Sequence, residues 1–173
     1  MTEDDVGRVM DEMPYGLYII GSMMEGEVNG MMADWVMQAS FQPRLVAVAF
    51  ENDARTLQSI RANKHFTINA LSQDQDGMHL AARFAQPYFG AKVRGRTRIA
   101  AEEIHRKLVG IPHTTTANGC PILEAAMAWL DCEAEQFLAT GDHTLVVARV
   151  LEGKLLRDAQ PLTSSYTGWN YSG

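Results

Sequence analysis

An almost wholly apolar run at residues 44–50 leads directly into a helical pattern, and this junction constrains the fold more than any other feature of the sequence. The run suits a strand that is covered on both faces rather than one that faces water. Polar residues 51–53 end the strand, and residues 54–62 then place Leu57 and Ile60 on one face of a helix. The sequence therefore predicts a buried strand that runs straight into a helix.

Most of the remaining segments predict strands that are joined by hairpins. Strands are expected at residues 15–22, 30–36, 66–71, 126–134 and 144–151, helices at residues 3–12 and 74–85, and a long excursion with short helical pieces at residues 87–121. No GxGxxG sequence follows a strand, as it would in a doubly wound dinucleotide-binding fold. We expect the 173 residues to form a single α+β domain built on an antiparallel β-barrel.

The strand expected at residues 126–134 has the clearest alternation. Leu130, Cys132 and Ala134 point one way, and the acidic residues between them, beginning with Asp131, point the other. This pattern predicts a half-exposed antiparallel strand whose acids face water. The chain's two cysteines, Cys120 and Cys132, lack a CxxC spacing, so we expect buried thiols rather than a zinc site or a disulfide framework.

Composition argues against several classes of partner. The formal charge of −6 disfavours a nucleic-acid partner, because binding a phosphate backbone requires a net positive face. No apolar run reaches the roughly 18 residues that would indicate a membrane span. The start of the chain is acidic, whereas a secretory signal begins with basic residues and a long apolar run. We therefore expect a cytoplasmic protein with neither a nucleic-acid nor a membrane partner.

The first candidate binding site is the corner between the apolar strand and its helix, from Asn52 to Thr56. A helix start exposes free backbone N–H groups at the positive end of the helix dipole, and Arg55 and Thr56 add side-chain donors. Such a corner can hold a phosphate. The alternative is that Asp53 caps the helix and Arg55 is merely solvated.

The second candidate is the sequence NGMMADWV at residues 29–36. Its glycine permits close approach of a ligand to the backbone, and its Met, Ala and Trp side chains offer apolar surface to a flat ring. The alternative is an ordinary hairpin that enters the core, with Trp35 as a packing residue.

His143 is the third candidate, because it follows a tight turn at the start of a strand, where ligands of β-barrels commonly bind. The alternative is a structural histidine. The other four histidines show no metal-ligand pattern, and no nucleophile–base pair is apparent.

Four separated blocks together resemble the flavin reductase-like, FMN-binding split-barrel family. They are NGMMADWVMQASFQPRLVAVAFEND, FTINALSQDQ, CPILEAAMAWLDCEA and GDHTLVVARV, in the family's order and over most of the chain. The resemblance implies a homodimer of Greek-key split β-barrels with short flanking helices. It also implies an FMN at or near the subunit interface, with the phosphate close to the helix start described above.

The resemblance also implies which residues hold the cofactor. The residues that would line the flavin are Met32, Ala33, Asp34, Trp35 and Val36, and those adjacent to it are Ala49, Phe50, Glu51 and Asn52. The phosphate would bind Arg55 and Thr56. Other sides of the site would be closed by Phe89, Gly90 and Trp169. His143 would look toward the nicotinamide or the flavin edge as the catalytic residue. The family often has serine where this chain has Asp34, and an acid at that position disfavours a nearby anion.

Hydride transfer from NADH or NADPH to FMN, or to FAD, is the activity that the resemblance implies. One alternative is an FMN-bearing electron-transfer module that accepts electrons from a redox protein partner. Another is a flavin-binding protein without catalysis. The resemblance provides no pattern for residues 87–116.

Overall fold

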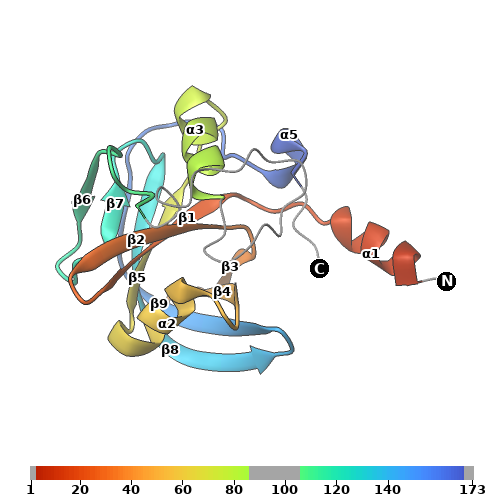
Figure 1. Ribbon diagram of the computed structural model, residues 1–173, viewed down its shortest axis with the longest axis horizontal. Coiled ribbons are helices and arrows are strands. Elements are labelled where there is room, and N and C mark those ends of the chain that lie inside the picture. Colours follow the sequence, from red (N-terminus) through yellow and green to blue (C-terminus); the bar gives the residue numbers. More distant parts are fainter. Residues whose placement is uncertain (1–2, 86–105, 170–173) are drawn as a thin grey trace.

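The computed structural model describes residues 3–85 and 106–169, and it is dominated by a seven-stranded antiparallel sheet of order β2-β1-β5-β8-β9-β4-β3. The strands are β1 (Tyr18–Met24), β2 (Glu27–Ala33), β3 (Val36–Ser40), β4 (Leu45–Glu51), β5 (His65–Ala70), β8 (Ala128–Thr140) and β9 (His143–Leu155), with a separate hairpin of β6 (His113–Thr115) and β7 (Pro121–Leu123). The helices are α1 (Glu3–Asp11), α2 (Arg55–Asn63), α3 (Gln75–Phe84) and α5 (Ser164–Thr167) (Figure 1). No described helix has the length and apolar character needed to cross a membrane.

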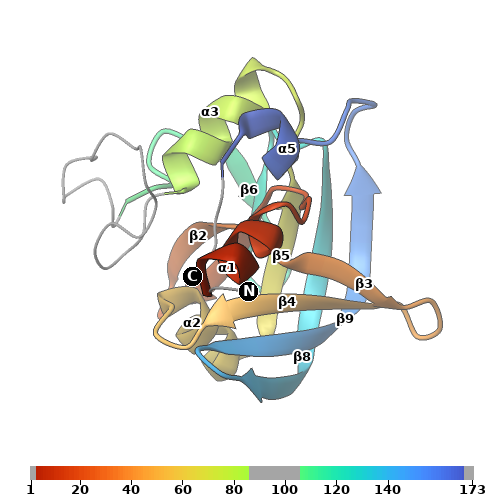
Figure 2. The ribbon, with the colours of Figure 1, turned by 90° about the vertical axis from the view of Figure 1, so that its right-hand side faces the viewer.

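The sheet curls because its two edge strands follow one another in the chain. β2 and β3 lie at opposite edges, yet only Asp34 and Trp35 separate them in sequence. Two residues bridge the gap only if the sheet wraps round until its edges approach, as Figure 2 shows. Within the described residues no ladder joins β2 to β3, so the barrel is split at this connection. The predicted α+β split-barrel fold with short flanking helices is confirmed.

The barrel interior is filled by apolar side chains from the strands and from α2. The apolar run of β4 contributes Val46, Val48 and Phe50, and Phe50 meets Phe66 of β5 edge-on, with ring centroids 6.4 Å apart. Leu57 and Ile60 of α2 join this core and are almost fully buried. The predicted strand-to-helix junction therefore anchors one side of the barrel core.

A second apolar cluster lies between the sheet, α3 and the C-terminal segment. It includes Leu17, Leu80, Phe84, Leu123 and Leu162, all at most 2% exposed. The β6–β7 hairpin is fixed to the sheet by buried Asn69, which donates to Pro121 O at 3.4 Å and accepts from Leu123 N at 2.8 Å. The sheet is thus covered on both faces over much of its area.

The prediction that the acids of β8 face water is wrong at Asp131, which is only 6% exposed. Asp131 pairs with Thr67 of β5, and the Thr67 hydroxyl donates to Pro121 O at the start of β7, so the hairpin covers this face. A register shift between Asp131 and Cys132 further distorts the alternation. Cys132 is buried as predicted, and so is Cys120, both as free thiols.

Candidate functional site

The corner after β4 and the turn between β8 and β9 are joined by three hydrogen bonds of Asn52. Its backbone N–H donates to Asp142 O at 3.0 Å, and its Nδ2 donates to Gly141 O at 2.9 Å. The Thr144 hydroxyl donates to Asn52 Oδ1 at 2.7 Å. The ladder between β4 and β9 continues this contact, because Glu51 pairs with His143. Asn52 therefore holds two of the predicted segments together through its own hydrogen bonds.

Helix α2 begins at this corner without a capping side chain. Ala54 is its N-cap residue, in an extended conformation, and the first turn contains no acid. Asp53 is therefore not the N-cap residue, contrary to the alternative that it caps the helix. A helix start without a cap or an acid leaves first-turn N–H groups and the positive end of the dipole available to an anion.

The two predicted phosphate ligands at this corner differ in accessibility. Thr56 is buried at 2% exposed, whereas the Arg55 side chain is 28% exposed. Arg55 Nη2 lies 3.6 Å from Glu27 Oε2, and the Glu27 side chain is 79% exposed. A surface ion pair of this kind contributes little to stability, so an incoming phosphate can replace the carboxylate.

The connection between β2 and β3 brings Trp35 against His143. Their ring centroids are 4.7 Å apart with an interplanar angle of 36°, and the ring of Tyr15 lies 6.4 Å from that of Trp35. Trp35 is also fixed through its backbone, because its carbonyl accepts from Ala49 N at 3.1 Å. The tryptophan of the NGMMADWV segment thus lies at the same junction as the Asn52 corner.

Asp34 is the buried acid of this junction, with 9% of its surface exposed. Burial raises its pKa from an ordinary 3.8 to about 6, and backbone hydrogen bonds and the nearby His143 oppose the shift. His143 Nδ1 lies 2.7 Å from Asp142 Oδ1, with the His143 side chain 12% exposed and that of Asp142 89% exposed. The imidazole therefore has a buried carboxyl and an exposed carboxylate as neighbours.

The other predicted site residues fall into three groups. Ala33 and Phe50 are buried in the barrel core with Val36 packed against it, so they support the junction from within. Met32 packs against the second cluster instead, because alternate residues of β2 face opposite sides of the sheet. Trp169, which follows α5, packs against the same cluster. Phe89 and Gly90 lie outside the described residues. Whether any of these residues touches a ligand stays a prediction.

Three residues of the junction were missed by the sequence reasoning. Asp142, in the turn, and Thr144, in β9, flank His143, so the GDHT sequence itself could have indicated them. Tyr15 follows Pro14 in a segment that was assigned to a strand, and nothing in its local pattern indicated a contact with Trp35.

Comparison with known proteins matches the family described as "Flavin reductase like domain" over residues 10–170. The diflavin flavoprotein A 1 of Synechocystis sp. is 31% identical over 166 residues, which are 94% of this chain and 26% of that protein. The chain spans about a quarter of the length of the curated relatives it matches.

Solved structures show the same fold. The crystal structure of nitrilotriacetate monooxygenase component B from Mycobacterium thermoresistibile has 25% identity and a TM-score of 0.76, covering 93% of this chain and 81% of that one. The flavin reductase PheA2 has 26% identity and a TM-score of 0.74, covering 94% of this chain and 93% of that one.

Proposed function

Because this chain belongs to the flavin reductase-like domain family, we propose that it binds FMN at the junction of β4, α2 and the β8–β9 turn and reduces it with NADH or NADPH. FAD is the alternative flavin. The family match supports a flavoprotein oxidoreductase, and the similarity to PheA2, itself a flavin reductase, supports flavin reduction. The single observation that carries the choice of site is the uncapped start of α2 beside Arg55, at the same junction as Trp35.

The residues of the corner fit the phosphate of FMN. The first turn of α2 offers backbone donors, and Arg55 adds a planar fork that exchanges Glu27 for the phosphate. Asn52 does not need to touch the ligand, because its hydrogen bonds to the β8–β9 turn keep the corner in position. Its role is to keep the donors preorganised.

The residues around Trp35 fit a flat aromatic ring. Trp35 and Tyr15 offer aromatic surface, and the backbone of Trp35 is fixed to β4 by its hydrogen bond with Ala49 N. Asp34 would be buried further by a bound ring, which raises the carboxyl pKa again and favours the protonated acid, a hydrogen-bond donor. A protonated Asp34 carries no charge that would repel an anionic ligand.

A bound flavin supplies the hydride-accepting chemistry, so no residue of this chain needs to act as an acid or base at the reacting carbon. The protein must hold the two rings in register and keep water away. His143 is proposed to contact the nicotinamide, and Asp142 and Trp35 fix the orientation of its imidazole.

A second candidate function is an electron-transfer module that receives electrons from a redox protein partner. The observation that favours it is the size of the diflavin flavoprotein relatives, in which a segment like this chain makes up about a quarter of the protein. A homodimer with the flavin near the subunit interface is part of both proposals.

An absorption spectrum of the purified protein, repeated anaerobically with each reduced nicotinamide, separates these functions. Bleaching of bound flavin by NADH or NADPH supports the reductase. Flavin that binds but resists both donors leaves the electron-transfer module or a flavin-binding protein without catalysis, and no flavin binding at all rejects all three.

Replacing Arg55 with Ala tests the phosphate site. Loss of a charged hydrogen bond should weaken FMN binding by about 1–3 kcal/mol, or roughly 5- to 150-fold in Kd. Arg149→Ala is the matched control, because Arg149 is half exposed on β9 and pairs with Glu135. Equal FMN affinities of the two variants in a fluorescence titration would remove Arg55 from the site.

A further inference from the structure

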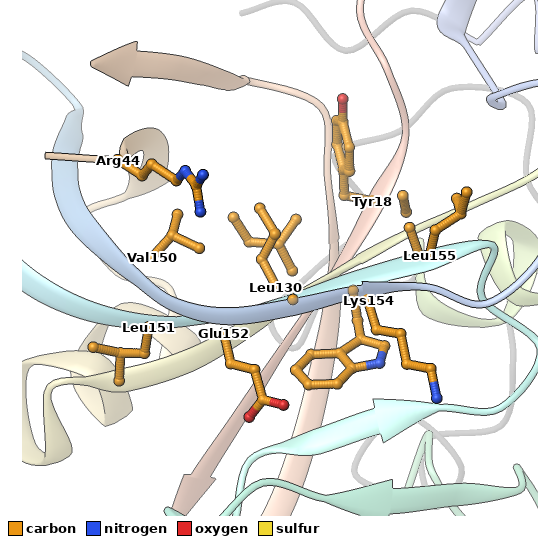
Figure 3. A pocket seen from close by; sticks show the side chains of 13 residues that line it. Tyr18, Arg44, Leu130, Val150, Leu151, Glu152, Lys154 and Leu155 are labelled. Carbon is orange, nitrogen blue, oxygen red and sulfur yellow. The ribbon is translucent and has the colours of Figure 1, made fainter. Parts of the chain in front are cut away.

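Strand β9 contains a bulge that changes which of its side chains share a face of the sheet. Two consecutive residues of β8 pair with Val150 and Glu152, so Leu151 between them has no partner in that ladder. An extra residue of this kind reverses the alternation of the side chains beyond it. Val150 and Leu155 therefore rise from one face, although regular alternation would separate them, whereas Leu151, Glu152 and Lys154 hang from the other face (Figure 3).

Gly153 deepens the hollow that the bulge creates. It pairs with Leu130 of β8, and a Cβ at position 153 would lie 2.5 Å from Leu130 Cδ2 and 2.9 Å from Trp129 O. No larger residue fits without displacing the sheet, so the Leu130 side chain occupies the place of the missing Cβ. The result is a pocket of about 470 Å³, within the range of roughly 300–1,000 Å³ that is typical of small-molecule sites.

The lining of this pocket, which we call the mouth pocket, extends the barrel core to the surface. Its apolar side chains are Tyr18, Leu130, Val150 and Leu155. The first three are half-buried and pack against the core, whereas Leu155 is 64% exposed at the outer end. Covering such a surface removes apolar area from water, which favours a ligand with a hydrocarbon part.

Two polar side chains of the pocket are unpaired within the described residues. Arg44 reaches over Val150 toward Leu130 (Figure 3), and no carboxylate in the described part of the chain pairs with it. The Tyr18 hydroxyl makes no hydrogen bond to the described residues either, and burial raises the pKa of Tyr18, so the group is a neutral donor. The phenol ring lies over Gly16, where a Cβ would be 2.5 Å from the hydroxyl oxygen. An apolar lining with a few polar groups at its edge is typical of a ligand site.

We propose that the mouth pocket binds a medium-chain aliphatic carboxylate, with its chain along Leu130, Val150 and Leu155 and its carboxylate paired with Arg44. The guanidinium fork matches a carboxylate in geometry and in charge, and the Tyr18 hydroxyl adds a donor. A phosphate dianion would keep an uncompensated charge beside the apolar lining, which is costly. Val150 and Leu155 lie roughly 15 Å apart along an extended strand, and this length suits a linear chain.

The mouth pocket contains no residue of the phosphate corner and none of the ring cluster around Trp35. A carboxylate ligand there is therefore independent of the proposed flavin site, and the two proposals can fail separately.

Isothermal titration of the full-length protein with octanoate tests the pocket directly. Octanoate should bind with a Kd below about 1 mM. Octan-1-ol, which has the chain without the charge, and acetate, which has the charge without the chain, should each bind at least about ten-fold more weakly.

Two variants should weaken octanoate binding by about ten-fold or more: Arg44→Gln removes the cation, and Leu155→Asp places a second negative charge in the lining. Both residues are exposed, so their replacement should leave the fold intact. Arg149→Gln is the matched control and should leave octanoate binding unchanged, because Arg149 already pairs with Glu135 and does not line the pocket. The FMN affinity of Arg44→Gln should equal that of the wild type.

Four results would overturn the proposal. They are the absence of saturable octanoate binding, equal affinity in the wild type and both pocket variants, equal affinity for octan-1-ol and octanoate, and displacement of octanoate by FMN. An octanoate affinity that falls as the protein concentration rises would also overturn it, because a second copy of the chain would then cover the mouth pocket.

Discussion

Replacing Asp34 with Asn should stabilise the apoprotein at neutral pH, which is the reverse of the usual result for a buried polar residue. Burial raises the pKa of Asp34 from 3.8 to about 6. In the unfolded chain this carboxyl releases its proton near pH 4, whereas the folded protein retains it until about pH 6. Folding therefore takes up a proton between these values, and stability falls as the pH rises through this window.

The size of the effect follows from the shift. About two pKa units at 1.36 kcal/mol each give a loss of about 3 kcal/mol above pH 6, of which about 2 kcal/mol falls between pH 4.5 and pH 8. Asn has nearly the same shape and does not ionise. The difference in unfolding free energy between Asp34→Asn and the wild type should therefore grow by about 2 kcal/mol over this range in favour of the variant.

Urea unfolding at pH 4.5 and pH 8, followed by tryptophan fluorescence, measures this difference. The control is Asp158→Asn, because Asp158 is an exposed carboxylate outside the junction, and its replacement should leave the pH dependence close to that of the wild type. A constant difference between Asp34→Asn and the wild type at both pH values would refute the reasoning. It would mean that the Asp34 carboxyl ionises as it does in the unfolded chain.

The same substitution bears on the flavin. In the wild type, FMN binding that needs a protonated Asp34 should weaken as the pH rises from 6 to 8. The side-chain amide that Asp34→Asn introduces donates a hydrogen bond at every pH, so the FMN affinity of the variant should change less over the same range. Parallel pH profiles of Kd for the two proteins would place Asp34 outside the flavin contact.

Three further predictions concern the frame of the domain. Asn52→Ala should lower the unfolding free energy by about 1–3 kcal/mol, because it leaves partners in the β8–β9 turn unpaired; equilibrium urea unfolding measures this loss. Gly77→Ala drives a Cβ into the backbone of Ser72 and should cost about 1–3 kcal/mol in a thermal melt, unlike Gly7→Ala, where the Cβ meets nothing among the described residues. Burial raises the pKa of Cys120 to about 11, so an aromatic disulfide reagent at pH 8 should react with it only after unfolding.

The fold was predictable from the sequence where the signal is local. The apolar run of β4, the polar stop after it and the helical spacing of Leu57 and Ile60 appear in the structure within one or two residues. The turn before His143 was predictable from its glycine, because Gly141 adopts a positive φ of 85°, a conformation that favours glycine. Each of these features depends on residues that are neighbours in the chain.

The parts that could not be predicted depend on distant segments. Asp131 looked solvent-exposed because its own strand alternates, and only the β6–β7 hairpin covers it. Asp53 looked like a helix cap, but Ala54 occupies that position. The hydrogen bond of the Asn52 side chain to the β8–β9 turn, 89 residues away, was not predicted, and whether Asn52 also lies beside a ligand stays a prediction.

The split of the barrel explains why the candidate site contains a buried acid. A connection of two residues between opposite sheet edges leaves no room for a solvated loop, so Asp34 and Trp35 are pressed against the start of β9. A serine at position 34 would avoid the free-energy cost of burying a carboxylate. Asp34 instead has a raised pKa, so its charge changes near neutral pH. Because His143 lies beside it, any ligand that covers Trp35 also alters the electrostatic balance between the two side chains. We therefore expect binding of the proposed flavin at Trp35 to be coupled to proton uptake by Asp34.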